Sequence, residues 1–107
     1  MASSIASALS AAIPAAEKSL GVLRATPYQE LRRLPTQSIA ELAHCGRRVT
    51  LTTYVEVFAQ HGDEVQVVIQ LVAHGWLGIN RVWAQGFRAT HRGVRRRLRK
   101  AELRGYT

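Results

Sequence analysis

The residues with the clearest chemical potential are the basic side chains near the C-terminus. Seven of the thirteen positions from 92 to 104 are arginine or lysine, and two further arginines precede them after Gly78. The same stretch contains one acidic residue, Glu102. A guanidinium group binds phosphate in a two-point geometry and stacks on nucleobases. The nine candidate nucleic-acid-binding residues are Arg81, Arg88, Arg92, Arg95, Arg96, Arg97, Arg99, Lys100 and Arg104.

The charge of the whole chain also favours a polyanionic partner. Its 107 residues include 15 Lys and Arg against 7 Asp and Glu, which gives a formal net charge of +8. Thirteen of the 15 basic residues are arginine. Crowded like charges repel one another, and binding to phosphates relieves this repulsion and releases counterions. The sequence therefore predicts RNA or DNA as the partner, with an acidic protein partner or a solvated tail as alternatives.

Two aromatic residues, Trp83 and Phe87, precede the basic cluster at strand spacing. On one face of a strand with Arg81, they could extend a binding surface by stacking on bases. Aromatic side chains at this spacing are more often part of a core. The stacking surface is the weaker of these two interpretations.

The sequence contains no recognisable catalytic or cofactor motif. It lacks a G-x-S-x-G elbow, an H-E-x-x-H pair, a P-loop and a G-x-G-x-x-G loop. Its four histidines and its single cysteine, Cys45, do not have the spacing of a metal site. We expect a non-enzymatic binding protein without a metal or cofactor. A small-molecule pocket between helices and sheet is a further alternative.

Two alternating apolar runs in residues 47–73 predict the β-hairpin around which the chain is organised. A polar break with Gly62 separates them and can form a tight reversal. Residues 79–88 predict a third strand, in which Gly86 indicates a bulge or a close neighbour. The short connections predict an antiparallel meander. The face expected to meet the helices carries Val55, Val57, Val67, Ile69 and Leu71.

Helical patterns precede the hairpin. Apolar residues at helical spacing predict a helix within residues 3–23, which Pro14 kinks or divides into two. A helix-start pattern predicts a second helix over residues 27–34. A capping box that begins at Ser38 predicts a third, short helix over residues 39–45.

After residue 90 the pattern is ambiguous. Apolar residues at i, i+4 and i+7 favour a basic helix over residues 95–104, and a short fourth strand, Val94–Leu98, is the alternative. The expected fold is α+β, with N-terminal helices on a three- to four-stranded antiparallel meander. The single domain would comprise a helical segment (1–25), short helices (26–46), the sheet (47–90) and a basic segment (91–107).

The remaining expectations concern association and location. The sheet face opposite the predicted helices carries Tyr54, Phe58, Val68 and Val72, which suggests a homo-oligomer formed through this face. No apolar run approaches the roughly 18–20 residues of a membrane span, so no membrane partner is expected. The Ser- and Ala-rich N-terminus lacks the basic start of a secretory signal. We expect a cytoplasmic protein and give an organellar transit segment less weight.

Overall fold

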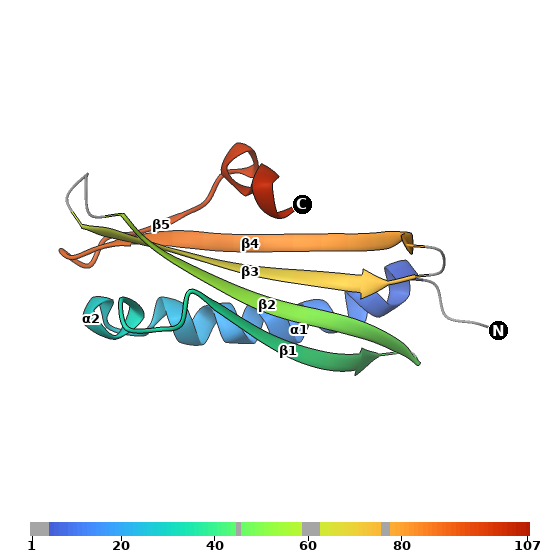
Figure 1. Ribbon diagram of the computed structural model, residues 1–107. Coiled ribbons are helices and arrows are strands. Elements are labelled where there is room, and N and C mark those ends of the chain that lie inside the picture. Colours follow the sequence, from blue (N-terminus) through green and yellow to red (C-terminus); the bar gives the residue numbers. More distant parts are fainter. Residues whose placement is uncertain (1–4, 45, 59–62, 76–77) are drawn as a thin grey trace.

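A computed structural model, which describes residues 5–44, 46–58, 63–75 and 78–107, shows a long helix on one face of a five-stranded antiparallel sheet (Figure 1). The predicted α+β class is confirmed, but the sheet has five strands and not three or four. The elements are α1 (Ile5–Arg24), α2 (Tyr28–Leu31), β1 (Gln37–His44), β2 (Arg47–Phe58), β3 (Glu64–His74), β4 (Asn80–Thr90), β5 (Arg95–Arg97) and the 3₁₀ helix η2 (Lys100–Tyr106).

The strands follow one another in the order β1-β2-β3-β4-β5, so the predicted meander is confirmed. The central hairpin is also confirmed, because β2 and β3 pair from Val49↔Ala73 to Phe58↔Glu64. The predicted reversal spans residues 60–64, of which 60–62 lie outside the described residues. Asp63 has a positive φ of 55°, and β3 begins at Glu64. Gly86 has the close neighbours that its place in β4 suggested. A Cβ there would lie 2.3 Å from the carbonyl oxygen of Val67 and 2.8 Å from Leu98 Cδ1.

The main core lies between α1 and the sheet. Four residues of α1 at helical spacing are buried: Ala8, Ala12, Ala16 and Leu20. Alanine brings the helix backbone close to the strands, because its side chain is short. The predicted face is confirmed, since Val67, Ile69 and Leu71 are fully buried beneath the helix, although Val57 remains 41% exposed.

The prediction of a helix over residues 39–45 is wrong, because residues 37–44 form strand β1 (Cys45 lies outside the described residues). The segment contains good helix formers, but β2 offers eight paired positions, from Gln37↔Tyr54 to His44↔Arg47. The backbone bonds of this ladder outweigh the intrinsic helix preference of a short segment. Ala40 and Leu42 lie on the face toward α1, because they pair with the core residues Leu51 and Val49, and Ile39 and Glu41 lie on the other face. This alternation is the pattern of a strand.

The N-terminal helices also differ in detail from the prediction. Helix α1 is a single helix with Pro14 inside it, so the division into two helices is wrong. Helix α2 covers Tyr28–Leu31 and is shorter than the predicted helix over residues 27–34. Leu31 and Tyr28 are buried, which anchors this short helix at the end of the main core.

The predicted α-helix over residues 95–104 is wrong as well. Residues 95–97 form strand β5, close to the alternative that placed a fourth strand at Val94–Leu98, and η2 follows as a 3₁₀ helix. The reason lies in two leucines, because Leu98 and Leu103 are both buried against Val68 on the sheet face opposite α1. A continuous helix on the predicted register would have used Val94, which is 60% exposed.

The C-terminal segment therefore covers part of the second sheet face (Figure 1). Tyr54 and Tyr106 pack around the Val68 cluster with their rings 5.1 Å apart. Gln70 ties η2 to the sheet, since its Nε2 donates to the carbonyl oxygen of Tyr106 at 2.5 Å. The face that was expected to need a partner is partly covered by the same chain.

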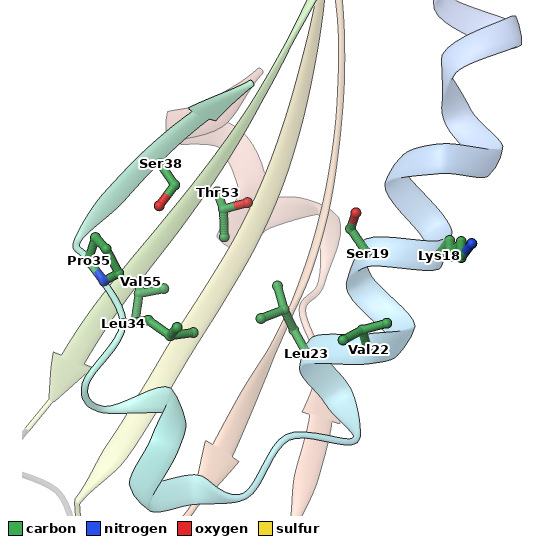
Figure 2. Close-up of a pocket in the computed structure, with 9 residues that line it drawn as sticks. All are labelled: Lys18, Ser19, Val22, Leu23, Leu34, Pro35, Ser38, Thr53 and Val55. Atoms are coloured by element: carbon green, nitrogen blue, oxygen red, sulfur yellow. The ribbon is translucent and has the colours of Figure 1, made fainter. Parts of the chain in front are cut away.

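A groove runs between α1 and the strands β1 and β2 (Figure 2). Its cavity volume is about 390 Å³. Apolar side chains form most of its wall, Ser19, Ser38 and Thr53 add hydroxyl groups, and Lys18 also lines it. The apolar lining residues are Val22, Leu23, Leu34, Pro35 and Val55.

Candidate polyanion interface

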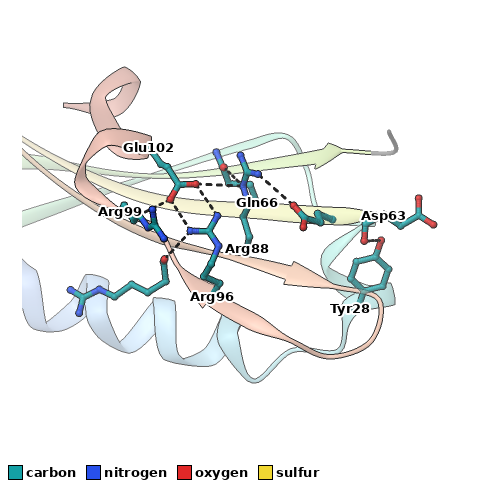
Figure 3. Close-up of polar contacts among 9 residues, drawn as sticks. Tyr28, Asp63, Gln66, Arg88, Arg96, Arg99 and Glu102 are labelled. Carbon is teal, nitrogen blue, oxygen red and sulfur yellow. Dashed lines mark hydrogen bonds and ion pairs between the residues drawn. The ribbon is translucent and has the colours of Figure 1, made fainter. Parts of the chain in front are cut away.

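Three of the nine predicted binding residues are held by other groups of the chain. The first is Arg96, whose two Nη atoms pair with the two carboxylate oxygens of Glu102 at 2.8 and 2.9 Å (Figure 3). This two-point geometry is the strong form of an arginine–carboxylate pair. Glu102 also accepts the backbone N–H of Arg99 at 3.0 Å, at the start of η2. The only acidic residue of the segment is thereby used to fix the turn from β5 into η2.

The pKa of Glu102 reflects these contacts. The hydrogen bonds from Arg96, followed by the bond from the Arg99 backbone, lower the pKa of Glu102 from an ordinary value of 4.5 to about 2. Both partners stabilise the carboxylate form. The same hydrogen bonds raise the pKa of the Arg96 guanidinium. This pair is therefore ionised at every physiological pH.

Arg88 is the second residue held in place. It lies directly opposite Gln66 across the β3–β4 ladder, and its Nε donates to Gln66 Oε1 at 2.9 Å. Its Nη1 lies 3.4 Å from Glu64 Oε2, and its guanidinium carbon lies 4.8 Å from the centre of the Phe58 ring. Arg88 on β4 is therefore bound to two side chains of β3, and its guanidinium group covers the Phe58 ring.

Arg95 is the third. Its Nη2 donates to the carbonyl oxygen of Thr26 at 2.6 Å, just past the C-terminal end of α1. The guanidinium groups of Arg95 and Arg24 each lie 5.8 Å from the centre of the Phe87 ring. Cations are stabilised at a helix C-terminus, where the backbone carbonyls are unpaired. Arg95 therefore fastens β5 to the end of α1.

The other six candidates are exposed, and their side chains make no hydrogen bond or ion pair within the described ranges. Arg81 is separate from the rest, because it lies at the opposite end of β4 beside Ala73, roughly 23 Å along the strand from Arg88. The other five surround the β5 edge of the sheet. Arg92 lies in the turn before β5, Arg97 lies on the α1 side of the sheet, and the others lie in or beside η2, which packs on the opposite face. We call these five residues the C-terminal basic surface: Arg92, Arg97, Arg99, Lys100 and Arg104.

A polar hollow of about 270 Å³ adjoins this surface, between α1 and the β4–β5 edge. Arg97 and Arg24 both line it, together with Gln85 and Glu17. Two guanidinium groups and an amide can hold a phosphate group, which Glu17 partly opposes. Arg24 was not predicted as a binding residue, because it lies 73 positions before Arg97 and its only sequence signal is its place in the last turn of a helix.

The aromatic residues do not extend this surface. Phe87 is fully buried, and Trp83 is half-buried against the same core. Both lie on the face that α1 covers, so the interpretation as core residues is confirmed and the stacking surface is wrong.

The described residues offer little for other kinds of chemistry. No group of three histidine, cysteine, aspartate or glutamate side chains in the described ranges could hold a metal ion. The groove of Figure 2 is lined by hydroxyl groups and the amine of Lys18, with no carboxylate or histidine among its lining residues. Among the helices described, none has the length and apolar character that crossing a bilayer requires.

Comparisons with protein-family models, curated proteins and solved structures found no match to this chain.

Proposed function

We propose that this chain is a non-catalytic nucleic-acid-binding protein that contacts phosphates through the C-terminal basic surface. The observation that supports this proposal is the exposure of five unpaired basic side chains around β5 and η2. Glu102, the acidic residue of the C-terminal segment, is already paired with Arg96. The surface thus keeps its positive charge in the folded chain, where mobile counterions or a polyanion must balance it.

The proposed contact is with the phosphate backbone and not with base edges. We expect this because β5 has three residues and η2 is a 3₁₀ helix, and neither is the α-helix or two-stranded ribbon that reads base edges in the major groove. The buried position of Phe87 removes base stacking on that ring. We therefore expect binding with little sequence preference and a steep dependence on salt.

The test measures the affinity for labelled single-stranded RNA and duplex DNA by fluorescence anisotropy, as salt is raised from about 50 to 200 mM. In the test variant, Arg99→Glu and Arg104→Glu reverse two charges of the C-terminal basic surface. In the matched control, Arg33→Glu and Arg81→Glu make the same change in net charge on other exposed positions.

We expect the test variant to lower the slope of log affinity against log salt by about one to two units, because each lost phosphate contact removes about 0.7–0.9. The control variant should keep the slope of the wild type. Equal weakening by the two variants would mean that net charge alone attracts the nucleic acid, and the proposed surface would be wrong.

The second candidate function is a structural or adaptor subunit that docks the same surface on an acidic protein partner. It is favoured by exposed apolar side chains away from the basic surface, such as Ile39 and Val82. Purification without nuclease or high salt separates the two candidates. An absorbance ratio at 260 and 280 nm typical of bound nucleic acid supports the first, and a stoichiometric protein partner with no nucleic acid supports the second.

A further inference from the structure

Strand β1 forms one edge of the sheet, and its outer backbone groups have no partner strand in the described chain. The N–H of Val55 donates to the carbonyl oxygen of Thr36 at 3.0 Å, in register with the pairing of Gln37 and Tyr54. In an antiparallel ladder, hydrogen-bonded pairs alternate with pairs whose groups point the other way. The outward N–H and C=O groups of β1 therefore belong to Gln37, Ile39, Glu41 and Ala43.

Nothing in the side chains of β1 protects this edge from pairing. Natural edge strands avoid pairing through lysine, proline, bulges or a covering element. Strand β1 spans eight residues without lysine, arginine or proline, and its first five residues are all exposed. Its one charged residue, Glu41, already has a cation nearby, with its Oε1 3.8 Å from Arg48 Nη1. Ile39 is 62% exposed.

We infer that β1 pairs antiparallel with β1 of a second copy of this chain, about a two-fold axis through Ala40. In this register Gln37 faces Ala43 of the second copy and Ile39 faces its Glu41, so each outward residue meets an outward residue. The four pairs exchange two backbone hydrogen bonds each. The interface is isologous, which is the commonest form of a symmetric dimer.

The symmetric pairing centred on Ala40 is more favourable than the symmetric pairings centred on the residues next to it. A shift that centres the axis on Glu41 places two carboxylates directly opposite each other, which is unfavourable. A shift that centres it on Ile39 leaves the groups of Ala43 without partners. Shifts by an odd number of residues would set outward groups against inward ones. Only the Ala40 register satisfies all four outward residues without opposing like charges.

The distribution of charge favours a second copy at this edge in spite of the net charge of +8. The other edge strand, β5, reads Arg95-Arg96-Arg97 and would repel its own copy. It lies four strands from β1, or about 19 Å at the usual strand spacing. This distance exceeds twice the screening length of about 8 Å at physiological salt. Pairing through β1 therefore keeps the two C-terminal basic surfaces at opposite ends of a ten-stranded sheet.

Sedimentation of the full chain, at tens of micromolar and moderate salt, tests this inference. We expect a dimer for the wild type. Ile39→Lys and Ile39→Pro should each give a monomer, the first through charge and the second through loss of an outward N–H. Proline at this position removes no hydrogen bond to β2, so the fold is retained. Ile79→Lys is the control and should remain a dimer, because Ile79 is also 62% exposed and lies outside β1.

Amide hydrogen exchange gives a second test that does not depend on a variant. The N–H groups of Ala40 and Leu42 point toward β2 and should be protected at every concentration. Those of Ile39, Glu41 and Ala43 should gain protection only as the protein concentration rises. A monomeric wild type at these concentrations, or a dimer that both Ile39 variants leave intact, would overturn the inference. A dimer with no added protection at Ile39 would also overturn it, since another surface would then be responsible.

Discussion

Arg96 and Arg97 are neighbours in the sequence and have different roles in the folded chain. Arg96 points to the η2 side of the sheet and is bound by Glu102, whereas Arg97 lines the hollow beside α1 and is exposed. The alternation along β5 separates them. The density of basic residues was evident from the sequence, but their division into paired and unpaired groups depends on which strand face each occupies.

Arg95 should be important for stability and not for nucleic-acid binding. Arg95→Ala removes the bond to the Thr26 carbonyl oxygen and the contact with Phe87. Hydrogen bonds from charged donors contribute about 1.5–3 kcal/mol, and we expect a loss of unfolding free energy of about that size. Urea unfolding measures it. The salt slope for RNA should match that of the wild type, and a lower slope would place Arg95 in the binding surface.

The Glu102 carboxylate should make stability depend on pH in the acid range. Its pKa is depressed to about 2 in the folded state, so it binds protons more weakly than in the unfolded chain. The stabilisation is fully present above the ordinary value of 4.5 and is lost as the pH falls toward 2. Thermal unfolding of Glu102→Gln and the wild type should therefore differ above pH 5 and converge near pH 2. A constant difference across this range would contradict the depressed pKa.

At the scale of elements, the hairpin could be predicted because its two runs are long, β-branched and alternating. Residues 37–44 could not, because Ala, Glu and Leu suit a helix and only the neighbouring β2 decides the outcome. Residues 95–104 were misread for a related reason, since Leu98 and Leu103 pack on Val68 from a strand end and a 3₁₀ helix. In both segments the deciding contact is with a residue distant in sequence.

The 3₁₀ helix η2 should be held mainly by Leu103. Its side chain is 8% exposed and packs with Leu98 on Val68. Leu103→Ala should cost about 2 kcal/mol of unfolding free energy, near the low end for buried leucines, because the cluster is small and can partly collapse. Val94→Ala is the matched control at a 60% exposed position, and we expect a change within about 0.5 kcal/mol. Chemical unfolding that gave equal losses for the two variants would contradict this account of η2.

At the scale of the whole molecule, the fold is elongated, with extents of 51 × 23 × 20 Å. Strands β2, β3 and β4 contain 11 or 12 residues each and run beside α1 (Figure 1). The two edges of the sheet differ in character, since β1 is nearly uncharged and β5 is basic. This difference in charge between the two edges was not evident from the sequence, because residues 39–45 were predicted as a helix and not as part of an edge strand. The proposed dimer would use the β1 edge, and the proposed contact with a polyanion would use the β5 edge.

The meander has a further consequence for how the chain acquires its structure during translation. Each strand pairs with the strand made just before it, so the sheet can grow by successive addition as the polypeptide leaves the ribosome. Helix α1 is synthesised before the strands, yet it packs mainly on β3 and β4. Most of the stability of a helix in a protein comes from the packing of its apolar face, and α1 also contains Pro14. Helix α1 therefore lacks most of its docking surface until β3 and β4 have been synthesised, and its alanine-rich face stays exposed to solvent throughout that interval.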